Sequence, residues 1–279
     1  MAKLVAAIAA SHGPLIVREW NSVPADRQAR LTAAFRELGS RLTAAKPDVL
    51  IIVSPDHWIN FFINNLPSVC IGVGESHDGP PEAFLKDFPH KTLAGHPELA
   101  GHILRTALQN DFEPSVSHHL KLDHGFVIPF WRMELPFVPK IIPIIVNDLE
   151  PPMPSIKRCL SWGRLLTQAI ESYPGNLRVA IMATGGLSHS IGEPTMGDID
   201  ENFDRECIRL MREGKDAPII EYLEKTLPTI GNGAHEVRNW VVVHGAAGSR
   251  GFDLVDYLPV PEVYVGCGFA SWSTAGARP

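Results

Sequence analysis

Two histidines follow apolar, strand-like segments of the sequence within a few residues. His12 stands in S-H-G-P after residues 3–9, and His57 stands in S-P-D-H-W after residues 49–53. A lone histidine in such a turn is often structural, with its ring nitrogens bonded to the backbone, yet imidazole is also the commonest metal ligand in proteins. Because ligands of open α/β sheets sit beyond the carboxyl ends of the strands, two histidines at matching strand ends favour a metal site.

A third ligand is needed, and no cysteine is suitably placed to supply it. Glu236 in G-N-G-A-H-E-V-R-N-W begins an expected helix over residues 236–245 and would project from its first turn. Its neighbour His235 lies about 100° away around a helix and should point elsewhere. Asn239 and Trp240 share the face of Glu236 and could orient it. Two histidines and one carboxylate form the set typical of non-haem iron(II) with open coordination positions. Without the histidines, Glu236 would be interpreted as a carboxylate favoured by the helix dipole.

Two further histidines are candidates for acid–base chemistry. His189 stands in A-T-G-G-L-S-H-S after a strand-like segment, and His124 stands in L-D-H-G-F-V-I-P before an apolar one. A neutral imidazole near pH 7 can take up a proton and return it. Either ring could instead be a core histidine held by Ser188 or Asp123.

The remaining histidines and the cysteines are assigned no chemistry. Four histidines are expected on polar loops or helix surfaces: His77, His90, His96 and His102. For the doublet His118–His119, a loop role and a substrate role both stay open. The four cysteines are far apart and are expected to be buried, unreactive thiols of a reducing compartment.

Strand-like and helix-like segments alternate along the chain. Short apolar runs predict buried strands at residues 3–9, 49–53, 69–73, 141–146, 178–183 and 263–266. Three- and four-residue apolar spacing predicts helices at residues 27–45, 96–110, 156–172, 202–213 and 217–226. This alternation predicts an α/β fold with a mixed, mostly parallel sheet flanked by helices on both faces. No linker or repeat interrupts the chain, so we expect one domain over residues 1–279.

Composition excludes several classes of protein. The chain has 279 residues, 45% hydrophobic and 20% charged, with a formal net charge of −6 and no cluster of lysine and arginine. Nucleic acid is therefore not an expected partner. No stretch reaches the ~20 apolar residues of a membrane span. The short apolar run at residues 4–10 is a poor signal peptide, and we expect a cytoplasmic protein.

Five motifs in this order resemble the class III extradiol ring-cleavage dioxygenases, the family of the protocatechuate 4,5-dioxygenase catalytic subunit. They are S-H-G-P at His12, S-P-D-H-W at His57, D-H-G-F at His124, G-G-L-S-H at His189 and A-H-E-V-R-N-W at Glu236. Together they span nearly the whole chain.

The resemblance implies that His12, His57 and Glu236 bind Fe(II), and that His189 and His124 are the acid–base residues. It further implies a catechol-type diol or aminophenol substrate, dioxygen as co-substrate and a ring-opened semialdehyde product. Some members of the family use a small accessory subunit, and a homo-oligomer is the expected state for an enzyme of this size. The segment G-C-G-F-A-S-W, residues 266–272, is a candidate loop for reading the ring substituent.

Three other functions compete with this interpretation. A zinc-dependent hydrolase or ring opener could use the same ligand set, and a non-catalytic relative could keep the fold. A serine hydrolase with Ser188 as nucleophile is the third, but G-L-S-H-S lacks the second glycine of the nucleophile elbow.

Overall fold

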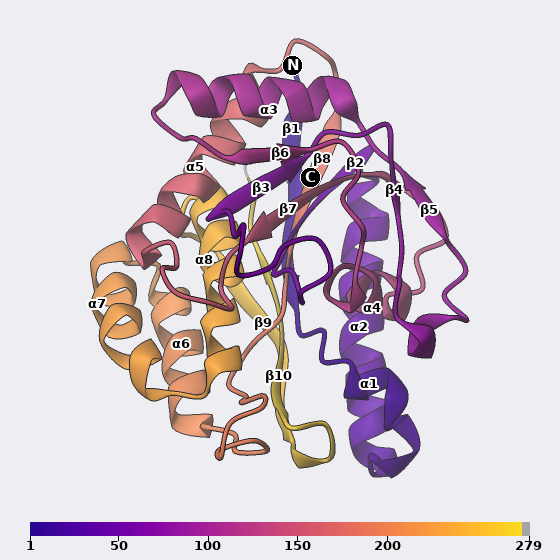
Figure 1. Cartoon of the computed structure of the whole chain (residues 1–279), viewed down its shortest axis with the longest axis vertical. Coiled ribbons are helices and arrows are strands. Elements are labelled where there is room, and N and C mark those ends of the chain that lie inside the picture. Colours follow the sequence, from indigo (N-terminus) through magenta and orange to yellow (C-terminus); the bar gives the residue numbers. More distant parts are fainter. Residues whose placement is uncertain (275–279) are drawn as a thin grey trace.

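A computed structural model describes residues 1–274 as an α/β fold built on one eight-stranded sheet (Figure 1). The strands follow one another across the sheet in the order β6-β3-β7-β2-β8-β1-β10-β9. Their bounds are β1 Lys3–Ala10, β2 Val49–Ser54, β3 Val69–Gly72, β6 Ser115–Ser117, β7 Lys140–Val146, β8 Arg178–Thr184, β9 Phe252–Val260 and β10 Val265–Trp272. A separate two-stranded sheet pairs β4 Ser76–Asp78 with β5 Thr92–Ala94. The predicted fold class is confirmed.

The four central strands β7, β2, β8 and β1 are all parallel to one another. Their sequences are continuous apolar runs, which is what strands covered on both faces require. Antiparallel strands complete the sheet, with β10 and β9 beyond β1 and β3 beside β7. The four parallel carboxyl ends therefore meet at one edge.

Helices cover both faces of the sheet (Figure 1). One face packs against α3 Pro97–Gln109, α5 Ile156–Ser172, α6 Glu201–Glu213, α7 Asp216–Thr226 and α8 Val237–Ala246. The other face packs against α1 Leu15–Arg18, α2 Ala25–Ala45 and α4 His124–Arg132. Five short 3-10 turns connect these elements: η1 Trp20–Ser22, η2 Ala83–Leu85, η3 Leu227–Thr229, η4 Asn232–Glu236 and η5 Pro261–Val263.

Two expectations about the C-terminal part of the sheet were wrong. The segment 263–266 is not one strand, because η5 ends at Val263 and β10 begins at Val265. Residues 266–272 are not a loop but the buried strand β10, paired on both sides. β9 was not predicted, because it is an edge strand whose Asp253, Asp256 and Pro259 obscure the strand pattern.

The described helices contain no segment long and apolar enough to cross a membrane. The four cysteines are buried free thiols, as expected.

Candidate metal centre and active site

Strand ends bring the predicted site residues together at the carboxyl edge of the parallel strands. β1 ends at Ala10, two residues before His12, and β2 ends at Ser54, three residues before His57. β8 ends at Thr184 and leads into the loop that carries His189. Glu236 ends η4 and precedes α8, so it reaches the same place from the helical layer. This is the edge at which ligands bind in open α/β sheets.

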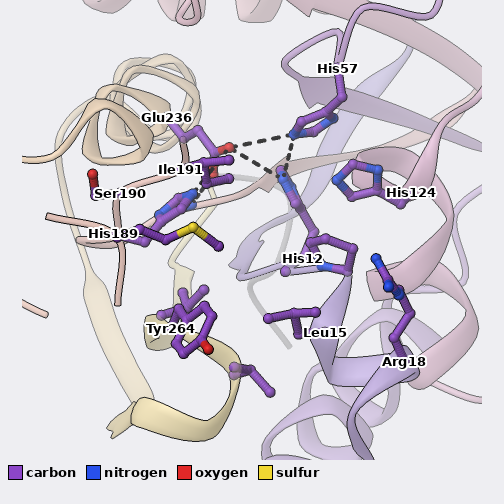
Figure 2. Close-up of a pocket in the computed structure, with 16 residues that line it drawn as sticks. His12, Leu15, Arg18, His57, His124, His189, Ser190, Ile191, Glu236 and Tyr264 are labelled. Atoms are coloured by element: carbon purple, nitrogen blue, oxygen red, sulfur yellow. Dashed lines mark hydrogen bonds and ion pairs between the residues drawn. The ribbon is translucent and has the colours of Figure 1, made fainter. Parts of the chain in front are cut away.

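Three ligand-type atoms converge at the centre of this edge (Figure 2). The Nε2 atoms of His12 and His57 are 3.2 Å apart. Glu236 Oε1 lies 3.4 Å from His12 Nε2 and 3.6 Å from His57 Nε2. The two imidazole planes meet at 90°, so their edges rather than their faces are turned together.

His57 is oriented by the buried carboxylate of Asp123. Asp123 Oδ2 accepts the backbone N–H of His57 at 2.8 Å and lies 3.1 Å from its Nδ1. A proton on Nδ1 then points at Asp123 and leaves the Nε2 lone pair facing His12 and Glu236. Such a carboxylate–histidine pair is the usual support of a metal-binding imidazole. Asp123 also caps α4 by accepting the N–H of Gly125 at 2.9 Å.

Glu236 is held by the glycine turn after β8. Its Oε2 accepts the N–H of Gly186 at 2.6 Å, which leaves Oε1 free to face the histidines. Gly185 has φ of 98°, and a Cβ there would lie 2.4 Å from Glu236 Oε2 and 2.9 Å from the His12 ring. Only glycine therefore lets the backbone pass this close to the two side chains.

The neighbours of Glu236 behave partly as expected. His235 points away and accepts a hydrogen bond from Arg238 Nη1 on its Nδ1 at 2.7 Å. The hydrogen bonds of Trp240 and Asn239 go to other groups than the carboxylate. Trp240 Nε1 donates to Gly185 O at 2.9 Å, and Asn239 Nδ2 donates to Thr184 O at 3.2 Å and to Asp148 Oδ2 at 2.9 Å. These bonds fix the turn after β8, and the Gly186 N–H of this turn holds the carboxylate of Glu236.

His189 lies on one side of this group with a free ring nitrogen. Its Nδ1 is 3.0 Å from the carbonyl of Leu187, so the N–H of the neutral ring belongs on Nδ1. Its Nε2 is 3.7 Å from Glu236 Oε1 and carries the lone pair. The suggested partner Ser188 is not involved, because its hydroxyl donates to Asp204 Oδ2.

His124 lies on the other side, at the first residue of α4. Its backbone N–H and its Nδ1 are both 2.9 Å from Glu82 Oε1. The partner is thus Glu82, 42 residues earlier, and not Asp123 as the sequence suggested. The bond to Glu82 leaves His124 Nε2 free to face the site.

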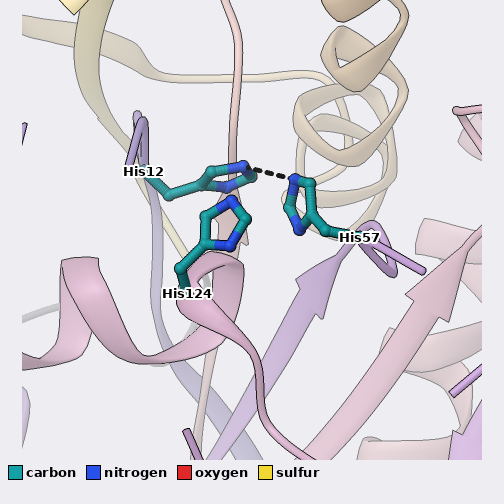
Figure 3. Close-up of side chains that lie close together, drawn as sticks. All are labelled: His12, His57 and His124. Carbon is teal, nitrogen blue, oxygen red and sulfur yellow. Dashed lines mark hydrogen bonds between the residues drawn. The ribbon is translucent and has the colours of Figure 1, made fainter. Parts of the chain in front are cut away.

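His124 is also an alternative third ligand for a metal. One ligand atom each from His12, His57 and His124 can be chosen so that all lie within 4.8 Å of one another (Figure 3). However, the His57 and His124 rings lie 3.9 Å apart between centroids with only 35° between their planes. Rings packed against each other in this tilted way do not turn their edges together as the rings of His12 and His57 do. Glu236 Oε1 has the better position, because it lies within 3.6 Å of the Nε2 atoms of both His12 and His57.

Burial and charge set the protonation of the centre. Burial lowers the pKa of His12 to about 4, although Glu236 opposes this shift. Burial also lowers the pKa of His57. The carboxylate of Asp123 outweighs burial, so the pKa of His57 is raised well above the ordinary value. Burial would raise the pKa of Glu236, yet the rings of His12 and His189 hold it well below the ordinary value. His12 therefore offers a neutral ring and Glu236 a carboxylate.

The residues present fit a divalent transition metal. Bonds of about 2.0–2.2 Å from one ion place neighbouring ligand atoms roughly 2.8–3.1 Å apart in octahedral geometry and roughly 3.3–3.6 Å apart in tetrahedral geometry. The observed separations of 3.2, 3.4 and 3.6 Å lie within the span of these two geometries. Two imidazoles and a carboxylate form a donor set suited to iron(II) and also to zinc.

A pocket of about 210 Å³ opens onto the centre. His12, His57, His124, His189 and Glu236 line its polar end. The rest is mainly apolar, formed by Pro14, Leu15, Ile191, Met196, Val263, Tyr264 and Val265, with Arg18 as well. All five residues singled out in the sequence therefore lie in one pocket.

The lining of this pocket does not include His77, the doublet His118–His119 or Ser188. His118 and His119 are exposed and do not line the pocket. His77 was expected on the surface but is buried in β4. Ser188 is fully buried and its hydroxyl is bonded to Asp204 and Asp200, so it is not presented as a nucleophile.

Several functional neighbours were missed. Asp123 was considered only as a partner of His124, and Glu82 and Arg18 were not considered at all. The D-H pair at residues 123–124 was the available signal for Asp123. Aspartate is a favoured N-cap residue, and Asp123 is the N-cap of the helix that begins at His124.

The family model of the catalytic LigB subunit of aromatic ring-opening dioxygenases matches residues 6–267. The chain belongs to this family. The LigB-family assignment confirms the resemblance seen in the motifs and places the chain among ring-opening dioxygenases, an oxidoreductase family.

Curated LigB-family relatives have a consistent name. The chain is 31% identical over 182 residues to a 2,3-dihydroxyphenylpropionate/2,3-dihydroxicinnamic acid 1,2-dioxygenase of Klebsiella pneumoniae (strain 342). It is 30% identical over 185 residues to the enzyme of that name from Escherichia coli O139:H28. These matches cover 64% and 65% of this chain but only 54% and 55% of the relatives. The chain thus spans about half the length of the curated relatives it matches.

A solved structure shares the fold. The crystal structure of the uncharacterized protein JW3007 from Escherichia coli K12 superposes with a TM-score of 0.66, covering 96% of this chain and 100% of that one. Sequence identity is 14%, so the likeness concerns the fold alone.

Proposed function

We propose that this chain is an iron(II)-dependent dioxygenase that opens the ring of a catechol-type diol or aminophenol by extradiol cleavage. The observation that carries the proposal is the triangle of His12 Nε2, His57 Nε2 and Glu236 Oε1, with edges of 3.2–3.6 Å, at the polar end of an otherwise apolar pocket. Family membership and the names of the relatives support it.

In this proposal His12, His57 and Glu236 would hold the metal at the polar end of the pocket. Iron(II) bound there would supply a site for the substrate oxygens and the redox chemistry that dioxygen requires. Asp123 fixes the ring of His57, and the N–H of Gly186 fixes the carboxylate of Glu236, so the ligand atoms need no rearrangement.

His189 is the base that we assign to the substrate hydroxyl. Its Nδ1–H is engaged by the Leu187 carbonyl, so its Nε2 can accept a proton without a change of tautomer. The proton remains in the site on a ring next to the negative charge of Glu236, which raises the pKa of His189 although burial lowers it. His189 can then return this proton as the ring opens.

His124 faces the pocket from the opposite side and is assigned as a second proton donor. Glu82 Oε1 holds its Nδ1, so Nε2 is the atom that can carry and release a proton toward the substrate. The apolar wall around Leu15, Val263 and Val265 excludes water, which protects reactive species from side reactions.

The test is anaerobic reconstitution with iron(II), followed by oxygen uptake and absorbance measurements on a panel of catechols and 2-aminophenol. The panel includes protocatechuate, gallate, 3-(2,3-dihydroxyphenyl)propionate and alkyl catechols. We expect oxygen uptake with a new visible absorbance of a ring-opened semialdehyde. Turnover with zinc but not with iron would overturn the iron proposal and favour a zinc-dependent ring opener or hydrolase.

The ligand set is tested by metal content. Glu236→Ala should lose most bound iron and all turnover, whereas His124→Phe should keep iron and lose turnover by about 10²-fold or more. His189→Ala should behave like His124→Phe. Iron retained in Glu236→Ala but lost in His124→Phe would show instead that His124 is the third ligand.

A homo-oligomer and a small accessory subunit remain predictions. Measurement of the mass of the purified protein in solution tests the first, and full turnover of this chain alone would remove the need for the second.

A further inference from the structure

The buried carboxylate of Asp204 has no part in the chemistry assigned above. Asp204 lies in the first turn of α6 and is 0% exposed. Among the described residues its hydrogen-bond donors are the N–H and the hydroxyl of Ser188 and the hydroxyl of Tyr257, at 2.7, 2.8 and 2.7 Å. Burying a carboxylate is costly unless such donors satisfy it. The position of the donors therefore indicates what Asp204 holds in place, and two of the three belong to the residue before His189.

The peptide group between Leu187 and Ser188 joins Asp204 to His189. Its N–H, from Ser188, donates to Asp204 Oδ1 at 2.7 Å, and its carbonyl, from Leu187, accepts from His189 Nδ1 at 3.0 Å. A trans peptide group is planar, and its N–H and C=O point in opposite directions. The carboxylate therefore lies at one end of this group and the imidazole at the other. Hydrogen bonds in such a chain polarise one another, so the negative charge beside the N–H strengthens the carbonyl as an acceptor.

The other polar groups of this segment are bonded as well. Leu187 N–H donates to Gly266 O at 2.8 Å, and Ser188 O accepts the N–H of Gly266 at 3.0 Å. The hydroxyl of Ser188 accepts the N–H of Asp200, the N-cap of α6, at 2.8 Å. A Cβ at Gly266 would overlap Asp204 Oδ2, so glycine is what lets β10 pass this close to the carboxylate. The segment is thus fixed from both α6 and β10.

The ring of His189 depends on this segment for its orientation. The bond from Nδ1 to the Leu187 carbonyl leaves Nε2 facing Glu236 Oε1, 3.7 Å away (Figure 2). A Cβ at Gly233 would overlap the imidazole, so this part of the chain packs closely against the ring. The hydrogen bond made by one nitrogen of an imidazole decides which form the other nitrogen takes. A displaced Leu187 carbonyl would therefore release both the orientation and the tautomer of His189.

We propose that Asp204 is a positioning residue for His189, acting through the Leu187–Ser188 peptide group to hold the ring in its Nδ1–H tautomer with Nε2 toward the site. This inference rests on the proposed function, in which His189 is the base. The intervening peptide group separates the two side chains, so the carboxylate can lie fully buried while the imidazole lines the pocket.

The ring can be observed in the metal-free protein, where no turnover is needed. Proton and nitrogen NMR of histidine-labelled protein gives the tautomer of His189 and the shift of its Nδ1–H, and His189→Ala identifies the signals. Spectra are recorded at about pH 8, above the pKa of about 7 to which burial raises Asp204. Asp204→Asn keeps an acceptor for the Ser188 N–H but removes the charge, so the Nδ1–H signal should move upfield with the tautomer unchanged. Asp204→Leu removes the acceptor, and the Nδ1–H tautomer should no longer predominate.

The iron-loaded protein tests the consequence for turnover. Asp204→Leu should lower kcat about 10²-fold with KM and iron content close to those of the wild type. Asp204→Asn should stay within about tenfold of the wild-type kcat, because the Ser188 N–H keeps its acceptor. Ser249→Ala is the matched control, since the Ser249 hydroxyl donates to the carboxylate of Asp216 outside the pocket. It should change neither kcat nor the His189 signals.

A residue that serves the fold alone would lower Tm without moving kcat or the signals of His189. Unchanged His189 signals in Asp204→Asn would therefore overturn the proposal, and so would loss of iron together with kcat in Asp204→Leu, which would mean that the whole site had collapsed. If Asp204→Leu does not fold, the Nδ1–H shift in Asp204→Asn decides. If the iron-loaded wild type opens no ring, the proposed function fails, while the spectra still decide whether Asp204 acts on His189.

Discussion

Replacement of Asp123 should separate metal binding from folding more sharply than any other change at the site. Its carboxylate accepts three hydrogen bonds: Oδ2 accepts the backbone N–H and the Nδ1–H of His57, and Oδ1 accepts the N–H of Gly125. In Asp123→Asn one oxygen becomes an NH₂ group that cannot accept. The amide should turn its oxygen toward His57, because this orientation keeps two bonds and loses one.

The lost bond is the N-cap of α4, worth about 1 kcal/mol. Asp123→Ala loses the cap and also leaves buried donors of His57 without an acceptor, at about 1–3 kcal/mol. A total near 3 kcal/mol is the expected loss in the free energy of unfolding. For 279 residues an unfolding entropy of about 2.1 cal/mol/K per residue amounts to about 0.6 kcal/mol/K, so Tm should fall by about 5 °C.

The affinity for iron(II) should change in the Asp123 variants independently of their stability. A neutral amide makes the His57 ring a weaker ligand than a carboxylate does, and loss of such a supporting group typically costs about 10–100-fold in affinity. Asp123→Asn should therefore bind iron(II) about tenfold more weakly with a small change in Tm, and Asp123→Ala still more weakly. Competition with a chelator measures the affinity, and thermal unfolding of the metal-free protein measures Tm.

Ser155→Ala is the matched control, because Ser155 caps α5 by accepting the N–H of Arg158 at 3.1 Å, away from the pocket. It should lower stability by about 1 kcal/mol and leave iron affinity unchanged. Wild-type iron affinity in Asp123→Ala would refute the reasoning, since it would mean that His57 needs no support from this carboxylate or is not a ligand.

Two further changes test the loop that carries His189. A Cβ at Gly233 would lie 2.1 Å from His189 Nε2, so Gly233→Ala should displace that ring, lower turnover about 10²-fold and leave iron content unchanged; normal turnover would exclude His189 as the base. Burial raises the pKa of Asp204 to about 7 in spite of three hydrogen-bond donors from Ser188 and Tyr257. The folded protein then holds a proton that the unfolded chain releases above pH ~4, so stability should fall by roughly 2–4 kcal/mol as pH rises from about 4 to about 7. Urea unfolding of the metal-free protein across this range should show the decline in wild type and not in Asp204→Asn, and parallel curves would contradict it.

The parallel part of the fold could be predicted because its strands are buried on both faces. Residues such as Ile51 and Ile181 then form continuous apolar runs, which stand out from the polar turns between them. The edge strand β9 has only one covered face and carries aspartates and a proline, so its sequence does not differ enough from a loop. The helix α4 was missed because it is short, buried and contains Pro129.

The candidate ligands could be predicted for a related reason. His12 and His57 directly follow strands whose carboxyl ends must share one edge of the sheet, so two local patterns were enough to place them together. The partners that orient them could not be predicted in this way. Asp123 is 66 residues from His57, and Glu82 is 42 residues from His124. Such pairs depend on how loops pack over the sheet, for which the sequence offers no periodic signal.

The candidate ligands and the pocket wall also differ in how firmly the fold holds them. The candidate ligands follow strands or begin helices that the core holds in place, whereas the pocket wall comes from α1, the loop after β8 and the turn η5. Ile191, Met196 and Tyr264 in these segments are substantially exposed, so substitutions there cost little packing energy. Under the proposed function, variation at these positions changes which ring substituent is accepted without disturbing the candidate ligands. The motifs around those ligands therefore identify the family and carry no signal for the substituent.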